Sequence, residues 1–80
     1  MEPFETIIRE AGREQRHVLV EIESTPGERY ARELEPYAIE NGALVAFSYL
    51  RDEFRTVPLA DVRSVQVTPR SFVPRRDVEL

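Results

Sequence analysis

Asn41–Leu50 reads NGALVAFSYL, and this stretch decides the fold. Asn-Gly is the strongest short signal for a two-residue hairpin turn, because both residues tolerate the positive φ that such a turn requires. The eight residues after the turn are almost wholly apolar, with Val45, Phe47 and Tyr49 on one face and their neighbours on the other. A short run of this kind predicts a central strand that is buried on both faces.

The residues on either side of this stretch predict four further strands. Apolar and polar side chains alternate between turn residues over 17–23, 29–39, 54–57 and 64–68. Pro26-Gly27 fits a type II turn between the first two of these strands, because glycine tolerates positive φ at the third turn position. Residues 58–61 predict one helical turn before the last strand.

The N-terminal segment predicts a short amphipathic helix. Phe4, Ile7, Ile8 and Ala11 recur at the spacing i, i+3, i+4 and i+7, so they form one apolar stripe. A helix followed by five short strands with tight turns predicts a mainly β domain whose sheet curls into a small barrel.

Length and composition restrict the class of protein. The 80 residues suffice for one domain, the absence of cysteine excludes disulfides, and no apolar run approaches the roughly 20 residues that span a bilayer. The acidic N-terminus lacks the basic start of a secretory signal, so we expect a cytoplasmic protein that does not bind membranes. The net charge of −4 argues against strong non-specific binding to duplex nucleic acid, but it leaves room for a local basic face.

The sequence contains little of the chemistry that catalysis needs. His17 is the single histidine and has no second ligand for a metal, so we expect it to be an ordinary surface residue. Carboxylate pairs such as Glu33 and Glu35 are expected to form a solvated strand face. No serine lies in a nucleophile-elbow context, and no glycine-rich loop could bind phosphates. We therefore expect no enzyme, no catalytic residue, no metal and no cofactor.

Four short motifs follow one another along the middle of the chain. They are Arg32–Tyr37 (RELEPY), Leu44–Phe47 (LVAF), Leu50–Thr56 (LRDEFRT) and Leu59–Val62 (LADV). Their order resembles that of the WYL domain family. The resemblance implies a small, strongly bent five-stranded barrel of the Sm or SH3-like kind, with an N-terminal helix. The signature tripeptide of the family is reduced to its leucine here, and the arginine of the last family motif is absent.

The resemblance also implies a function. It places a WYL-like domain over residues 3–72. The prolines and the adjacent arginines from Pro69 onward lead us to expect a flexible C-terminal tail at 73–80. WYL domains usually belong to bacterial transcription regulators, in which they resemble ligand sensors. The implied ligand is anionic, such as single-stranded nucleic acid or a nucleotide, held by arginines and stacked on aromatic rings. The candidate binding residues are Arg32, Arg55, Tyr37, Tyr49 and Arg63.

Two other interpretations stay open. In the first, the aromatic side chains are core residues and the arginines pair with the abundant glutamates. In the second, the chain is a protein-interaction or oligomerisation module without a small ligand. Such a module would bind a transcription regulator, or form a homo-oligomer, through exposed sheet edges.

Overall fold

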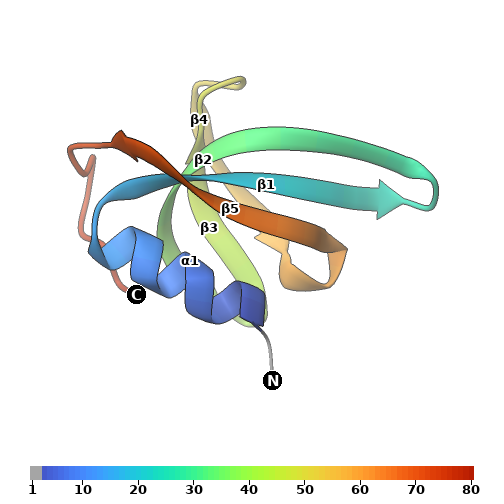
Figure 1. Cartoon of the computed structure of the whole chain (residues 1–80), viewed down its shortest axis with the longest axis horizontal. Coiled ribbons are helices and arrows are strands. Elements are labelled where there is room, and N and C mark those ends of the chain that lie inside the picture. Colours follow the sequence, from blue (N-terminus) through green and yellow to red (C-terminus); the bar gives the residue numbers. More distant parts are fainter. Residues whose placement is uncertain (1–2) are drawn as a thin grey trace.

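A helix and five antiparallel strands make up the chain, which the computed structural model describes from residue 3 to residue 80 (Figure 1). In chain order the elements are α1 (Pro3–Arg13), β1 (Arg16–Thr25), β2 (Glu28–Glu40), β3 (Ala43–Ser48), β4 (Glu53–Pro58), the 3₁₀ turn η1 (Leu59–Asp61) and β5 (Val62–Ser71). The strands form one open sheet in the order β4-β3-β2-β1-β5, so β4 and β5 are its two edges. The predicted mainly β fold with an N-terminal helix is therefore confirmed.

The tight turns predicted from the sequence are present. Asn41 and Gly42 have φ values of 53° and 75°, the left-handed pair that a type I′ hairpin turn needs. Gly27 has a φ of 85°, which fits the third position of the predicted type II turn. These two turns set the register of β2 against β1 and of β3 against β2.

The strand that we expected at the centre of the sheet is not the central one. Residues 43–48 form β3, which is second from an edge, whereas β2 lies in the middle. The sequence of β2 is typical of a peripheral strand, because charged side chains such as Arg32 and Glu33 interrupt its apolar positions. Tyr49 and Leu50 fall in the turn after β3 and not in the strand.

α1 is the only α-helix within residues 3–80. Its predicted apolar stripe is confirmed, because Ile8 and Ala11 are buried against the sheet and Phe4 packs against the same core. Glu5 and Arg9 form an ion pair one turn apart, with 2.9 Å between their charged atoms. No helix in this part of the chain has the length and apolarity needed to cross a membrane.

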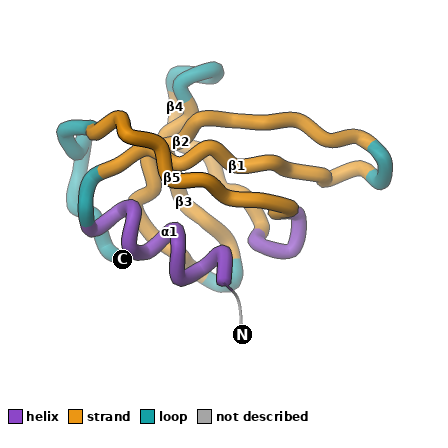
Figure 2. The backbone as a smooth tube through the Cα atoms, viewed as in Figure 1, coloured by secondary structure: helices purple, strands orange, loops and turns teal. Residues whose placement is uncertain are grey.

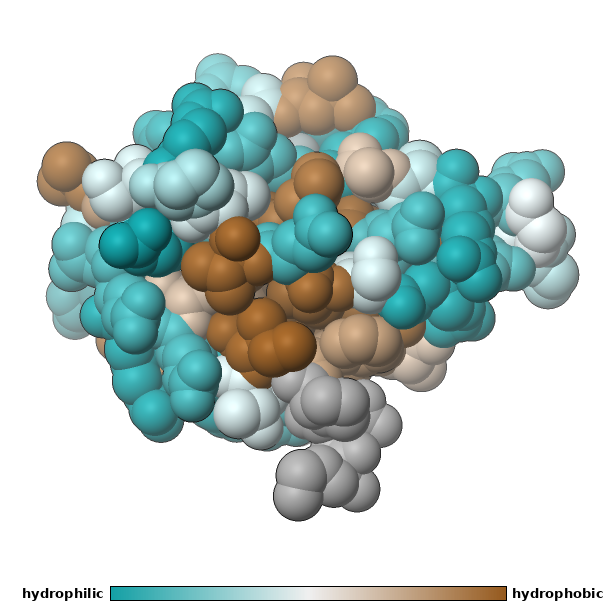
Figure 3. Space-filling model, viewed as in Figure 1, coloured by the Kyte–Doolittle hydropathy of each residue, from teal (hydrophilic) through white to brown (hydrophobic). Residues whose placement is uncertain are grey.

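The sheet has an inner face, which carries α1 and the main core, and an outer face on the opposite side. Ile8 and Ala11 of α1 meet apolar side chains from every strand of the sheet on the inner face. These strand residues are Val18, Val20, Ile22, Leu34, Leu44, Ala46, Val57 and Val62. Figure 3 shows further apolar surface between α1 and β5, whereas hydrophilic side chains dominate the end of the β1–β2 hairpin.

The outer face carries a second core, which we name the aromatic cluster. Its members are Tyr37, Phe47 and Phe72, with Tyr49 and Val78 packed against them. The β2–β3 register shifts between Pro36 and Ala38, which leaves Tyr37 as an extra residue in β2. This bulge lets Tyr37 join the cluster, where its ring centre lies 5.6 Å from that of Phe72.

Residues 72–80, which we name the C-terminal segment, return to the sheet and to the end of α1 (Figure 2). We expected 73–80 to be a flexible tail, yet the Glu79 N–H donates to the Tyr37 carbonyl over 2.7 Å. Leu80 lies so close to Gly12 that a Cβ on Gly12 would stand 2.0 Å from Leu80 Cδ1. The sequence gives no sign of these contacts, because each joins the chain end to a residue far away along the chain.

Candidate functional site

Three arginines line one hollow of about 400 Å³ on the inner face. They are Arg32 from β2, Arg55 from β4 and Arg51 from the turn between β3 and β4. Tyr30, Ser48 and Asp61 add polar groups to the wall, and Ile22, Leu34 and Val57 add apolar ones. A mixed lining and this volume are typical of sites for small molecules. We name this space the arginine hollow.

The strand register explains why these side chains meet. Arg32 lies opposite Val20 and two residues before Leu34, so its side chain continues the inner face beyond the core. Arg55 lies opposite Ala46, another inner-face position, on the edge strand β4. No described residue of α1 lines the hollow. The arginine hollow is therefore the part of the inner face that the helix leaves uncovered.

Two of the three guanidinium groups form no ion pair with a carboxylate among residues 3–80. Arg32 donates only to a backbone carbonyl and lies 4.5 Å from the centre of the Tyr30 ring. Arg51 donates no hydrogen bond from its side chain within the described residues, and it is exposed. Arg55 pairs with Glu53 over 2.9 Å, but both side chains are about half exposed, so water screens the pair. The hollow thus presents guanidinium groups that are free to bind oxygen anions in a bidentate manner.

The hollow also contains groups that suit the rest of a nucleotide-like ligand. Tyr30 is 40% exposed and presents an aromatic ring for stacking. Asp61, at the end of η1, brings a hydrogen-bond acceptor into the same space. The hollow therefore offers its arginines to the negative charge of such an anion, the Tyr30 ring to its aromatic ring, and Asp61 to its hydrogen-bond donor.

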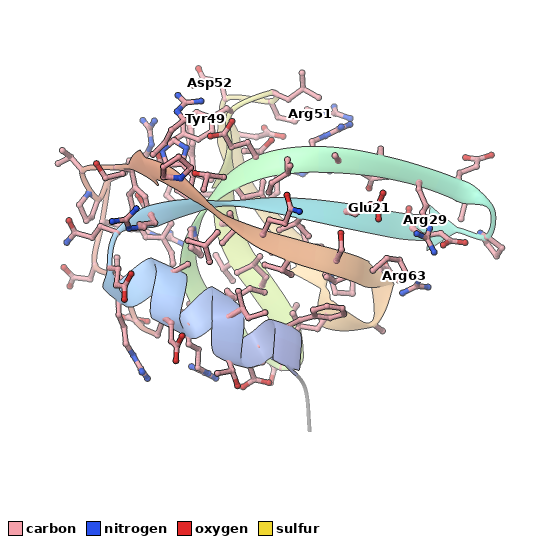
Figure 4. All side chains as sticks on the ribbon, viewed as in Figure 1. Glu21, Arg29, Tyr49, Arg51, Asp52 and Arg63 are labelled. Atoms are coloured by element: carbon pink, nitrogen blue, oxygen red, sulfur yellow. The ribbon has the colours of Figure 1, made fainter. Side chains whose placement is uncertain are left out.

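The structure divides the predicted binding residues between different places. Arg32 and Arg55 meet in the arginine hollow. Arg63 lies outside it, where its Nε is 3.4 Å from the Glu23 carboxylate. Figure 4 shows Arg63 on the same side of the molecule as the β1–β2 hairpin, well separated from Arg51 at the β3–β4 turn.

The two predicted tyrosines lie on the other side of the sheet. Tyr37 is 1% exposed within the aromatic cluster, and Tyr49 packs against the same cluster. Figure 4 shows Tyr49 on the side of the C-terminal segment and Arg51 on the side of the β1–β2 hairpin. A ligand in the arginine hollow therefore does not reach either tyrosine, and Tyr30 is the ring available to it.

A buried carboxylate organises the outer face. Glu35 is 2% exposed and accepts hydrogen bonds from the Tyr37 hydroxyl, over 2.7 Å, and from the Tyr49 hydroxyl. The Arg75 guanidinium binds both Glu35 oxygens, with Nε 3.1 Å from Oε1 and Nη2 3.3 Å from Oε2. The same guanidinium lies 3.7 Å from the centre of the Phe47 ring. The prediction of a solvated carboxylate face is therefore wrong for Glu35.

His17 links this carboxylate to a second one. Its Nε2 lies 2.8 Å from the Tyr49 hydroxyl, and its Nδ1 lies 2.7 Å from Glu33 Oε2. The Tyr49 hydroxyl donates its single proton to Glu35, so towards His17 its oxygen can only accept. His17 thus connects the Glu33 carboxylate to the Tyr49–Glu35 pair. The prediction of a surface histidine is wrong, because Glu33, Tyr49 and neighbouring strands leave His17 only 3% exposed.

The pKa values on the outer face follow from burial and hydrogen bonding. Burial alone would raise the pKa of Glu35, but hydrogen bonds from Tyr49, Tyr37 and Arg75 together hold this pKa below its usual range. Burial, and next to it the Glu35 carboxylate, raises the pKa of Tyr49. The hydrogen bond to Glu35 raises the pKa of Arg75. Glu35 and Arg75 are therefore both charged at neutral pH.

The binding residues chosen from the sequence do not include Arg51, which lines the hollow, and sequence reasoning missed the Glu35–Arg75 pair on the outer face. A signal existed for Tyr30, because Tyr30, Arg32 and Leu34 alternate along one strand and so share a face. Arg75 lies 40 residues from Glu35, and nothing local in the sequence connects the two.

Neither a protein-family model nor a curated protein matches this chain. Within residues 3–80, no group of three His, Cys, Asp or Glu side chains is arranged to hold a metal ion. The function proposed below therefore depends on the geometry and charge of the arginine hollow.

Proposed function

We propose that this chain is a non-enzymatic ligand-sensing module of transcriptional regulation, and that it binds an anionic ligand in the arginine hollow. The ligand is a single-stranded nucleic acid or a nucleotide. One observation carries the proposal: Arg32, Arg51 and Arg55 line one hollow, and Arg32 and Arg51 lack a carboxylate partner among residues 3–80. Guanidinium groups bind phosphate oxygens through paired, charge-assisted hydrogen bonds.

The other groups of the hollow suit the remaining parts of such a ligand. A base stacks on the Tyr30 ring, and Asp61 accepts a hydrogen bond from a base or a sugar hydroxyl. The chain is acidic overall, with a net charge of −4. A long nucleic-acid strand would therefore extend from the hollow onto negatively charged surface, which repels its phosphates, so only a few phosphates bind favourably. We therefore propose a short segment or a single nucleotide as the bound unit.

The WYL-like assignment is part of this proposal. An N-terminal helix followed by five antiparallel strands supports it, because the resemblance implies this order. In this view the bent sheet is of the Sm or SH3-like kind, and the module acts in the cytoplasm beside a DNA-binding partner. Occupation of the hollow would then change how that partner is presented to DNA.

Fluorescence anisotropy with labelled single-stranded DNA and RNA of about eight nucleotides tests the proposal directly. We expect binding that weakens between about 50 mM and 200 mM salt, with a slope of about −0.7 in log K per contacted phosphate. Arg51→Ala and Arg55→Ala should each weaken binding by about tenfold, because each removes charge-assisted hydrogen bonds.

Arg63→Ala is the matched control for these variants. Arg63 is also exposed, but it pairs with Glu23 and donates to the Ala60 carbonyl outside the hollow. It should leave the affinity unchanged. An equal loss of affinity in all three variants would place the binding elsewhere, and the absence of binding at low salt would refute the nucleic-acid ligand.

The alternative function is a protein-interaction or oligomerisation module. The two unpaired sheet edges, β4 and β5, favour it, because an edge strand can pair with a strand of another chain. Light scattering separates the two functions. A discrete oligomer that shows no thermal stabilisation by oligonucleotide favours the alternative, whereas stabilisation by oligonucleotide favours the ligand sensor.

A further inference from the structure

Arg75 occupies a site whose walls belong entirely to the sheet. Glu35 and Tyr37 come from β2, Phe47 from β3, and Tyr49 from the turn after β3. The two hydroxyls hold the Glu35 carboxylate, which faces the guanidinium, and the Phe47 ring covers the guanidinium plane. We name these four side chains the arginine receptor. The receptor does not depend on the C-terminal segment for any of its parts.

The rest of the C-terminal segment contacts the sheet and α1 along its length. Arg76 lies 4.0 Å from the centre of the Phe54 ring, Val78 packs against the aromatic cluster, and Arg13 Nε donates to the Leu80 carbonyl over 3.0 Å. The backbone of the segment donates twice to Tyr37, from Arg75 N–H to the hydroxyl over 2.8 Å and from Glu79 N–H to the carbonyl over 2.7 Å. Within the described residues, its strand-like pairing is the single bridge between Ala38 and Glu79. A hollow of about 460 Å³, lined by residues of both β2 and the segment, lies between them. The segment therefore arches over the sheet and does not add a full strand to it.

A short exposed stretch separates Arg75 from the last anchored residue of the sheet. Phe72 is 7% exposed in the aromatic cluster, whereas Val73 is 87% exposed. Pro74 follows, and proline has no backbone N–H with which to bond to the sheet. Val73 and Pro74 thus form a hinge of two residues. Rotation there moves residues 75–80 without disturbing Phe72.

An empty arginine receptor is unfavourable. Glu35 is 2% exposed with Arg75 in place, so loss of Arg75 takes away both the cation that faces this carboxylate and part of its cover. Whatever replaces Arg75 needs a guanidinium group that binds both carboxylate oxygens. A second copy of this chain supplies that group, together with a Leu80 side chain of the right shape to lie against Gly12.

We propose that residues 75–80 exchange between two copies of this chain, so that each Arg75 fills the arginine receptor of the other copy. The exchange forms a symmetric dimer in which every contact of the segment is made again across the interface. It requires only that the hinge at Val73 and Pro74 changes direction. This dimer goes beyond the proposed ligand sensing, because it uses the opposite face of the sheet.

Disulfide formation between single-cysteine variants of the full chain tests the exchange. The natural chain has no cysteine, and Ala38 and Glu79 pair across the bridge. A mixture of Ala38→Cys and Glu79→Cys chains can therefore form the 38–79 disulfide only when the segment of one chain lies on the sheet of another. Ser71→Cys replaces Glu79→Cys in the control mixture, because Ser71 pairs with Arg16 ahead of the hinge.

We expect the 38–79 mixed disulfide to form well above the level of the control mixture. Adding Arg75→Ala to the Glu79→Cys chain should reduce it to the control level. A peptide of residues 72–80 should compete, and a scrambled peptide of equal charge should not. Equal cross-linking in the test and control mixtures would overturn the exchange. Equal competition by the scrambled peptide would overturn the choice of a second copy and indicate that any arginine-containing peptide can fill the receptor.

Discussion

The two faces of the sheet use arginine in opposite ways. On the outer face, Arg75 is matched to the buried Glu35 carboxylate and to the Phe47 ring. On the inner face, Arg32 and Arg51 line an open hollow and form no ion pair with a carboxylate among residues 3–80. Arginine thus completes a hydrogen-bonded cluster on the outer face, whereas on the inner face arginines remain available to bind a ligand.

This difference separates stability from binding. Removing a buried partner leaves polar groups unsatisfied, which destabilises the fold, whereas removing an exposed arginine has little effect on stability. The comparison therefore predicts large stability effects on the outer face and large affinity effects on the inner face.

The largest effect is expected from Glu35→Ala. This change leaves the Tyr37 and Tyr49 hydroxyls and Arg75 without their common acceptor. We expect the free energy of unfolding to fall by about 2–4 kcal/mol, as measured by urea denaturation. Glu28→Ala, at an exposed hairpin position, is the control and should change it by less than about 0.5 kcal/mol. Equal losses in the free energy of unfolding for the two variants would contradict the special role of Glu35 in the stability of the outer face.

Tyr49→Phe should have an intermediate effect. It removes the hydroxyl that joins Glu35 to His17 but keeps the ring that stacks on His17. We expect a loss of about 1–2 kcal/mol in the free energy of unfolding. Tyr30→Phe, at an exposed ring, should be nearly neutral in the same urea experiment. A neutral Tyr49→Phe would show that the hydrogen-bonded chain contributes no stability.

The pH dependence of stability should come largely from the outer face. The pKa of Glu35 is lowered in the folded state, so its stabilisation is complete above the ordinary value of 4.5 and is lost as the pH falls below it. Thermal melts from neutral to acidic pH should show this loss in the natural chain. Glu35→Gln should flatten the acidic limb, leaving the smaller contribution of Glu23, whose pKa is also lowered. An unchanged acidic limb in the variant would exclude Glu35 as its cause.

The smallest stability effects are expected in the arginine hollow. Arg32→Ala and Arg51→Ala should each change the free energy of unfolding by less than about 0.5 kcal/mol. Each should nevertheless weaken oligonucleotide binding by about tenfold in the anisotropy experiment. A large loss of stability in either variant would mean that these arginines complete the fold, as Arg75 does.

Much of the fold was predictable from local patterns. The Asn41-Gly42 turn, the helix stripe through Ile8 and the alternation in β1 all report backbone geometry, which depends on neighbouring residues. The central position of β2 was not predictable in this way, because strand order depends on pairing between distant segments. Charged side chains on both of its faces, such as Arg32 and Glu33, concealed its burial.

The sites were predictable only in part. Arg32 and Arg55 were chosen from a resemblance, and the register brings them into one hollow. His17 was misjudged because its partners, Glu33 and Tyr49, lie 16 and 32 residues away. Contacts at such distances follow from the sheet register and the return of the chain end, and no local pattern encodes them.

The most direct test of the central claim is a titration of ¹⁵N-labelled protein with a short oligothymidylate, followed by two-dimensional NMR. The inner-face account predicts chemical-shift changes at Tyr30, Arg32, Arg51, Arg55 and Asp61 that saturate together. It also predicts that Glu35, Tyr37 and Arg75 on the outer face remain unchanged. Changes confined to those outer-face residues, or no changes at low salt, would contradict it.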